Sequence, residues 1–175
     1  MEVVIPAGGK GTRLFNNTKD KPKSMIPVAG IPMLEYLVNF FRKHNLKIFH
    51  ILTGHMSEYI ERNLGDGSKF DIKIIYHYEN KELGTAGSVK KIERYLNDYF
   101  LLVYSDIYVN MDLDKFIEFA KKKKGMGSLI CHPNLHPLDS DLLLLDKDDR
   151  IIDFFSKPHS PKKYFPNMVN AGISI

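Results

Sequence analysis

The chain has 175 residues, which suits one domain with a sizeable core, and its 43% hydrophobic and 26% charged content is ordinary for a globular protein. One cysteine, Cys131, excludes an internal disulfide, and no apolar run approaches the ~20 residues of a membrane helix or forms a signal peptide. We therefore expect a cytoplasmic protein without membrane contact. The net charge of +4 suits an anionic partner, without choosing between a small molecule, a nucleic acid and an acidic surface.

The first predicted element is a short buried strand, "MEVVI", which runs into the glycine-rich stretch "PAGGKGTRL" at residues 6–14. The carboxyl end of such a strand is where open α/β sheets bind ligands. A Walker A loop needs Ser or Thr directly after Gly-Lys, but Gly11 follows Lys10, and a dinucleotide fingerprint needs a glycine where Leu14 stands. What is left is either a plain tight turn or a turn whose amides face phosphate oxygens beside the donors of Arg13.

The loop from Phe15 to Pro32 is long for an α/β protein, and long loops are often functional. Lys23 stands in it between Pro22 and Pro27. Prolines on both sides are expected to hold this loop near-extended and to reduce the entropy lost when it is ordered. Taken alone, Lys23 is better explained as a solvated surface lysine.

Beyond this loop, apolar residues at helical spacing alternate with short apolar runs. Helices are predicted at residues 33–45, 56–65, 84–96 and 112–124. Strands are predicted at residues 47–54, 72–78, 99–106, 127–132, 141–146, 150–155 and 169–175. Repeated βα units give a parallel sheet covered on both faces, and the later run of strands makes it partly mixed. The predicted fold is a three-layer α/β sandwich, in which Lys121 to Lys124 form a solvated helix end rather than a nucleic-acid site.

Six short stretches occur in an order that carries a family resemblance: "GGKGTRL", "PKSMIP", "LGTAG", "SD" after an apolar strand, "SKP" and "NAG". The ordered set resembles the sugar-1-phosphate nucleotidyltransferases from Val3 to Ile175. The form "LGTAG" is most similar to mannose-1-phosphate and heptose-1-phosphate guanylyltransferases. The resemblance implies a Rossmann-like, GT-A-like fold and one nucleotidyltransferase domain over residues 1–175. It leaves the oligomeric state open, a homo-oligomer included.

The implied reaction transfers a nucleotidyl group, predicted to be GMP from GTP, to a sugar-1-phosphate and releases pyrophosphate. Both reactants are anionic, and two unit charges 4 Å apart repel by about 4 kcal/mol at an effective dielectric near 20. Cations must offset this repulsion and positioning must make the attack in-line. No covalent intermediate or general base is needed, because the attacking phosphate is already ionised. We therefore expect basic residues and glycines where a hydrolase would have a nucleophile and a base.

The resemblance assigns roles to matching positions of this sequence. Arg13 would hold the departing phosphates, Lys23 would neutralise the α-phosphate, and Asp106 would bind Mg²⁺, which needs few protein ligands when phosphates and water complete its shell. The expected nucleotide-binding residues are Ala7, Gly8, Gly9, Gly11, Thr12, Glu79, Leu83, Gly84 and Thr85. Glu79 would contact the edge of the base. The expected sugar-phosphate-binding residues are Gly87, Lys157 and Asn170.

The sequence also departs from the family pattern. Ser156 replaces a common glutamate before Lys157, Ser105 replaces a common glycine before Asp106, and Asn16 and Asn17 replace a common Pro-Leu pair. A second metal-binding aspartate, which family members carry further along, is absent. We therefore expect the chain to stop short of the C-terminal end of the family domain.

Three other readings compete with a transferase. A nucleotide or nucleotide-sugar sensor of the same fold would fit the missing aspartate and Ser156, but it has less need of cations aimed at a leaving pyrophosphate. A zinc site at Cys131, His132 and His136 requires a helix that Pro133 and Pro137 disfavour. A glycosyltransferase would use an Asp-x-Asp motif, and Asp112 to Asp114 matches those letters but is expected to cap a helix instead.

Overall fold

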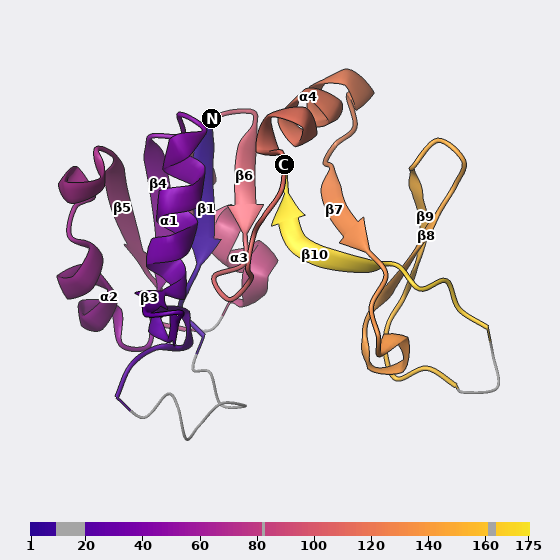
Figure 1. Ribbon diagram of the computed structural model, residues 1–175, viewed down its shortest axis with the longest axis horizontal. Helices are drawn as coiled ribbons and strands as arrows, with labels where there is room; N and C mark the ends of the chain where they lie inside the picture. The colour runs from indigo at the N-terminus through magenta and orange to yellow at the C-terminus, as the bar shows by residue number, and fades with distance from the viewer. Residues whose placement is uncertain (10–19, 82, 161–163) are drawn as a thin grey trace.

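The computed structural model describes residues 1–9, 20–81, 83–160 and 164–175, and it is built around a six-stranded sheet (Figure 1). The strand order is β5-β4-β1-β6-β10-β7. The first four are parallel, and β10 runs antiparallel to both β6 and β7. The strands are β1 (Glu2–Pro6), β4 (Ile48–Thr53), β5 (Lys73–Tyr78), β6 (Phe100–Val103), β7 (Leu129–His132) and β10 (Val169–Ser174). The predicted mainly parallel, partly mixed sheet is confirmed.

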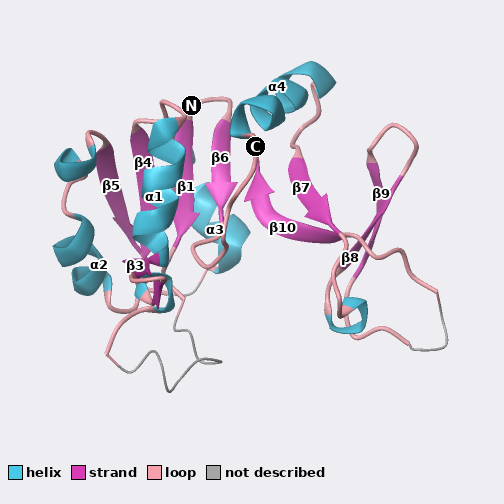
Figure 2. Ribbon diagram, viewed as in Figure 1, coloured by secondary structure: helices cyan, strands magenta, loops and turns pink. Residues whose placement is uncertain are grey.

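Four α-helices connect the strands, and the layers are visible in Figure 2, where α1 lies in front of the sheet and α3 behind it. The helices are α1 (Met33–Lys43), α2 (Ser57–Leu64), α3 (Gly84–Lys91) and α4 (Leu113–Lys123). Short 3-10 helices occur at η2 (Lys23–Met25), η3 (Ser68–Phe70), η4 (Glu93–Tyr95) and η5 (Pro137–Asp139). None of the described helices is long and apolar enough to cross a membrane.

The first face of the sheet carries the main hydrophobic core. It is covered by α1, by α2 and by the start of α4, which contribute Leu37, Ile60 and Leu113 among other fully buried side chains. Alternation along β1 sends Val3 and Ile5 to this face and Val4 to the other. On α1 the buried residues recur at helical spacing, which explains why the sequence predicted its position.

The second face is covered by α3 and η4 and has a much smaller core. Its buried apolar residues are Val4, Leu52 and Ile92. The sequence predicted one helix over 84–96, but α3 ends at Lys91. Ile92 leaves the helical conformation with φ −103° and ψ 7°, and its side chain is 1% exposed. The predicted continuous helix is therefore wrong: the chain leaves the α-helix at Ile92 and continues as the 3-10 turn η4, with Ile92 buried against the sheet.

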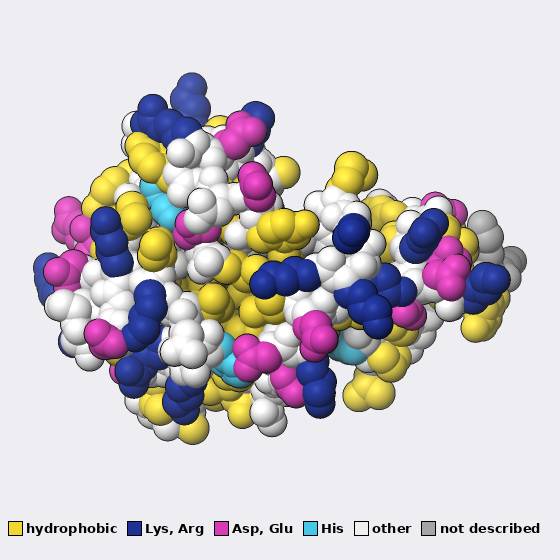
Figure 3. Space-filling model, turned by 90° about the horizontal axis from the view of Figure 1, so that it is seen from above, with side chains coloured by type: hydrophobic (Ala, Val, Ile, Leu, Met, Phe, Trp, Pro, Cys, Tyr) yellow, Lys and Arg dark blue, Asp and Glu magenta, His cyan; other side chains and the backbone are white. Residues whose placement is uncertain are grey.

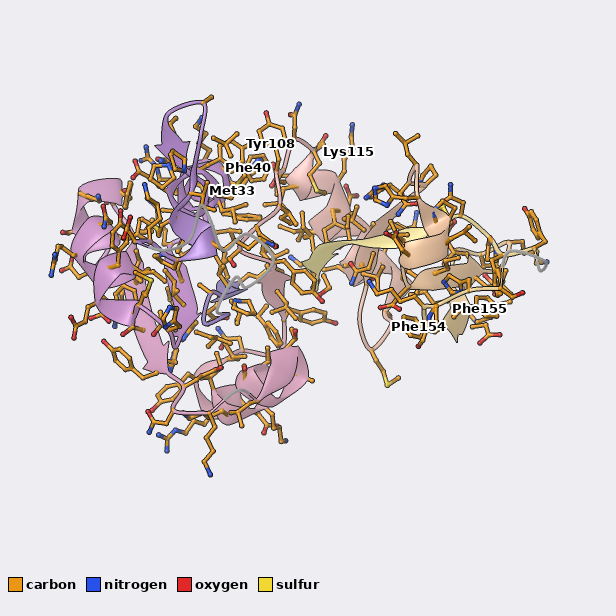
Figure 4. All side chains as sticks on the ribbon, turned by 90° about the horizontal axis from the view of Figure 1, so that it is seen from below. Met33, Phe40, Tyr108, Lys115, Phe154 and Phe155 are labelled. Atoms are coloured by element: carbon orange, nitrogen blue, oxygen red, sulfur yellow. The ribbon has the colours of Figure 1, made fainter. Side chains whose placement is uncertain are left out.

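A hairpin region lies apart from the main sheet. It consists of β8 (Leu142–Leu145) and β9 (Ile151–Phe155), which pair antiparallel in a sheet of their own. Phe154 and Phe155 mark this end of the molecule in Figure 4. A cavity of about 500 Å³ opens between α4, β6, β7 and β10. Seen from above, hydrophobic side chains are exposed in a hollow near the middle of the molecule, away from the hairpin region (Figure 3).

The predicted loop of residues 15–32 contains two short strands that sequence patterns did not indicate. They are β2 (Pro27–Val28) and β3 (Ile31–Pro32), which pair antiparallel around Ala29 and Gly30. Both turn residues have positive φ, 50° and 83°. This small hairpin connects η2 to the start of α1.

Candidate active site at the carboxyl edge of the sheet

The glycine-rich turn after β1 lies against the end of β4. The Ala7 amide donates to the Leu52 carbonyl at 2.8 Å, which continues the strand pairing up to Gly8. A Cβ on Gly8 would lie 3.1 Å from the Gly54 nitrogen, and a Cβ on Gly54 would lie 3.2 Å from the Gly8 carbonyl oxygen. Both positions therefore favour glycine, because a Cβ at either one would crowd the other backbone. Sequence reasoning missed Gly54, although a glycine as the last residue of the predicted strand 47–54 was the available signal.

Gly9 differs from Gly8 in its surroundings. A Cβ on Gly9 would meet no described atom within 4 Å. With respect to the described residues, the space beside Gly9 is open, which a bound nucleotide would require. The sequence also predicted three site residues that lie outside the described residues: Gly11, Thr12 and Arg13.

Lys23 and Asp106 come together although 83 positions separate them in the sequence. The Lys23 ammonium donates to the Asp106 carboxylate, and the two side chains are 38% and 36% exposed. The near-extended loop expected around Lys23 is wrong, because residue 23 begins the 3-10 helix η2. Ser24 and Met25 are buried in that turn, so burial rather than the flanking prolines holds Lys23 in place.

The segment that carries Asp106 is fixed on both sides. Before it, the Tyr104 amide donates to the Gly172 carbonyl of β10 at 2.9 Å. After it, the ring of Tyr108 stacks on Tyr36 of α1 with centroids 4.9 Å apart, and the Tyr36 hydroxyl donates to the Val109 carbonyl. Figure 4 shows Tyr108 beside the labelled α1 residues. Burial, followed by the neighbouring Tyr108, raises the pKa of Tyr36 to about 12, so its hydroxyl keeps the donated proton.

The start of α3 offers an exposed surface of small residues. Gly84 has φ 67°, and a Cβ on Gly87 would lie 3.0 Å from the Leu83 Cβ. The Ser88 hydroxyl donates to the Gly84 carbonyl at 2.7 Å and ties this turn to the helix. Thr85 is exposed beside them. A flat ligand can therefore approach the backbone here.

Glu79 lies immediately after β5, in line with the ends of β1 and β4. Its amide donates to the Thr53 carbonyl at 2.8 Å, and its carbonyl oxygen is 3.6 Å from where a Gly54 Cβ would lie. Its Oε1 is buried and has no hydrogen-bond partner among the described residues. A buried carboxylate oxygen without a donor costs free energy, so this atom is suited to accept from a ligand.

The family model for nucleotidyl transferases matches residues 2–175. The chain belongs to the nucleotidyl transferase family. It is 29% identical to a UTP–glucose-1-phosphate uridylyltransferase from Synechocystis sp. over 100% of this chain and 48% of that protein. It is 28% identical to a mannose-1-phosphate guanylyltransferase from Mycobacterium tuberculosis, again over 100% of this chain and 48% of the relative. The chain thus spans about half the length of these curated relatives.

A solved structure supports the fold of this nucleotidyl transferase family member. The structure of HddC from Yersinia pseudotuberculosis superposes with a TM-score of 0.80 at 26% identity, covering 99% of this chain and 75% of that one. HddC has also been solved in complex with GMP-PN.

Of the three residues expected at the sugar phosphate, Gly87 lies at the start of α3, and Asn170 and Lys157 lie in two other places within the nucleotidyl transferase domain. Asn170 is on β10, two residues before the Gly172 whose carbonyl accepts from the Tyr104 amide, and so toward the carboxyl edge of the sheet that Asp106 follows. Its Oδ1 accepts from the Gly172 amide at 2.8 Å, which leaves its NH₂ group as a donor. Lys157 follows β9, where its amide donates to Asp141 at 3.0 Å, and its ammonium contacts no described residue of the site.

Both competing metal motifs are contradicted. Asp112 caps α4, since its side chain accepts from the Lys115 amide at 3.1 Å, and Asp114 pairs with His44 at 3.1 Å. Within the described ranges, no cluster of three or more His, Cys, Asp or Glu could hold a metal ion. The proposed zinc trio fails because Cys131 and His132 are neighbours on β7 and therefore point to opposite faces.

Proposed function

We propose that this chain is the catalytic part of an enzyme that transfers GMP from GTP to a sugar-1-phosphate and releases pyrophosphate. The observation that carries the proposal is the Lys23–Asp106 pair beside the Gly8–Gly54 turn, at the carboxyl edge of the family's sheet. A cation and a carboxylate held next to an open glycine backbone are what charge-stabilised phosphoryl chemistry needs.

In the proposed reaction, a phosphate oxygen of the sugar-1-phosphate attacks the α-phosphorus of the nucleotide. The bond from that phosphorus to the bridging oxygen breaks, and pyrophosphate leaves with the bonding electrons. Lys23 would lie against the α-phosphate and offset the charge that builds there, with Arg13 assigned to the departing phosphates. Asn170 would donate from its NH₂ group to the sugar or its phosphate, and Lys157 would approach from the hairpin region.

The residues at Asp106 fit Mg²⁺ held jointly with phosphate. The carboxylate already attracts a cation, the Lys23 ammonium. Magnesium typically takes one or two protein carboxylates and completes its shell with water and substrate phosphates. When bound there, Mg²⁺ would polarise the phosphate oxygens and fix their geometry.

The choice of guanine rests on Glu79. Guanine presents adjacent N1–H and N2–H donors, which a carboxylate can accept together. Uracil and thymine present one N–H between two carbonyl oxygens, and these oxygens would face the carboxylate unfavourably. The unpartnered Oε1 of Glu79 therefore favours guanine. The GMP-PN complex of HddC and the guanylyltransferase relative agree with this choice.

The test is pyrophosphate release by this chain with Mg²⁺ and each of four nucleoside triphosphates, offered with mannose-, glucose- and heptose-1-phosphates. GTP with one sugar phosphate should give the fastest release. Lys23→Met should cut turnover by about a hundredfold or more while weakening nucleotide binding far less, because its charge matters most in the transition state. Glu79→Gln should reduce the preference for GTP over UTP. Nucleotide binding without release from any pair would favour a sensor instead.

A further inference from the structure

Lys23 and Asp106 satisfy each other in the ligand-free protein, although the proposed reaction needs them for different partners. The Lys23 ammonium donates to a carboxylate oxygen of Asp106. In that position it is withheld from an α-phosphate, and it places a positive charge on the oxygen that a divalent cation would use. Two like charges at such short range repel each other, more strongly at a partly shielded site than in open water.

The pair is held by the fold rather than by two flexible side chains meeting at the surface. The backbone of Lys23 begins η2, whose Ser24 and Met25 are 2% exposed. The Asp106 segment is pinned by the Tyr104–Gly172 hydrogen bond and by the Tyr36–Tyr108 stack. Both side chains are partly exposed, so ordering them still costs entropy, but the anchored backbones keep the ammonium and the carboxylate within reach of each other.

We propose that Lys23 blocks Asp106 against free divalent metal, so that the protein takes up metal only together with a nucleotide. A metal–triphosphate complex exchanges both partners at once: the metal replaces Lys23 on Asp106, and the phosphate receives the Lys23 ammonium. A free metal ion provides no anionic group that could pair with the displaced Lys23 ammonium. The pair would thereby prevent a metal ion from occupying the site in an unproductive position. This inference rests on the proposed function, since it assigns metal binding to Asp106.

The experiment measures binding of Mn²⁺ alone, by electron paramagnetic resonance of the free ion, with no nucleotide present. Lys23→Met should bind Mn²⁺ roughly fivefold more tightly than the unaltered chain, the upper end for loss of an exposed ion pair. The matched control is Lys21→Met, which removes the same charge two positions earlier in the chain. It should leave Mn²⁺ affinity unchanged. Circular dichroism spectra of the variants should match that of the unaltered chain.

A double variant locates the effect. Lys23→Met combined with Asp106→Asn should bind Mn²⁺ no more tightly than Asp106→Asn alone, because the gained affinity belongs to the released carboxylate. The inference is overturned if Lys23→Met fails to tighten Mn²⁺ binding, if Lys21→Met tightens it equally, or if the gain survives Asp106→Asn. Pyrophosphate release is a separate readout. A chain inactive with every substrate pair but showing the Lys23-dependent gain would refute the proposed function and retain the metal block.

Discussion

The two faces of the central sheet are made by alternate residues of the same strands, yet they differ in chemistry. The first face packs aliphatic and aromatic side chains from three helices into one continuous core. The second face buries Val4, Leu52 and Ile92 and places polar groups beside them. His50, 2% exposed, lies on this face with its Nδ1 2.8 Å from the Nε2 of His77, and Glu2 is buried on the neighbouring strand.

Because of this difference, we expect the first face to contribute most of the stability and the second face to contribute more to nucleotide binding. The first face carries most of the apolar burial, which is the main stabilising contribution in a domain of this size. The second face holds α3, whose first turn presents Gly84, Thr85 and Gly87 to the site. A helix held by few apolar contacts is easier to shift, so changes on the second face should reach nucleotide binding before they unfold the protein.

The largest expected effect is on the first face. Leu37→Ala removes a fully buried side chain of α1 and should lower the free energy of unfolding by about 3–5 kcal/mol, through lost burial and the cavity left behind. Urea denaturation monitored by circular dichroism measures this. Nucleotide affinity of the fraction that remains folded should stay unchanged. A strong loss of affinity in that fraction would break the proposed separation between the two faces.

A substitution on the second face should lower stability less than Leu37→Ala does, but it should weaken nucleotide binding. Ile92→Ala should cost about 2–3 kcal/mol, because the small core there collapses more readily around a missing side chain. It should also weaken GTP binding severalfold, since Ile92 seats the end of α3 on the sheet. Calorimetric titration of GTP tests this. Equal GTP affinity for Ile92→Ala and the unaltered chain would show that α3 is positioned by other contacts.

The stability contributed by the second face should depend on pH, whereas the stability contributed by the first face should not. Burial is the largest cause that lowers the pKa of His50, with Lys73 adding to it and Glu2 opposing it, and burial followed by His50 lowers the pKa of His77. As pH falls through the ordinary histidine value of about 6.5, the unfolded chain takes up protons that the folded chain does not. Stability should therefore be full above that pH and should fall below it, by at most about 1.4 kcal/mol per pH unit for each such proton.

Unfolding of a His77→Gln variant across pH 5 to 8 tests this assignment. Glutamine can still hydrogen-bond to His50 but does not titrate, so the dependence of stability on pH should become shallower. His55→Gln, on an exposed histidine, is the matched control and should leave the dependence as it was. An unchanged slope in His77→Gln would place the titrating group elsewhere.

The smallest expected effect concerns the cap of α4, which begins against the first face. Asp112→Ala should cost about 1 kcal/mol of stability, as losing an N-cap usually does, whereas Asp112→Asn should cost much less because asparagine also caps. Both variants should keep their response to Mg²⁺. Loss of this response would support the hypothesis that Asp112 and Asp114 bind a metal as an Asp-x-Asp motif, which the capping geometry contradicts.

Much of the fold could be predicted because it depends on local pattern. The alternation of strand and helix, the mixed later strands and the cap at Asp112 all follow from residues close together in sequence. The errors occurred where tertiary packing overrides local preference. Ile92 turns out of a helical stretch to fill the second face, and Lys23 begins a 3-10 turn because Ser24 and Met25 are buried. The burial of Ile92 and that of Ser24 and Met25 depend on distant segments, so the neighbouring sequence does not reveal either one.

The sequence by itself determined the family, the order of the elements and the nomination of Gly8, Lys23, Glu79, Asp106 and Asn170, since these depend on residue types and spacings that a single chain displays. Only the tertiary structure decided that Gly8 faces Gly54, that Lys23 and Asp106 pair with each other, and that one oxygen of Glu79 is buried without a donor from any described residue. The physical reason is the distance along the chain over which each interaction acts. Hydrogen bonding and hydrophobic periodicity act between near neighbours in the chain, whereas desolvation and charge pairing depend on which distant segments the folded sheet brings to one edge.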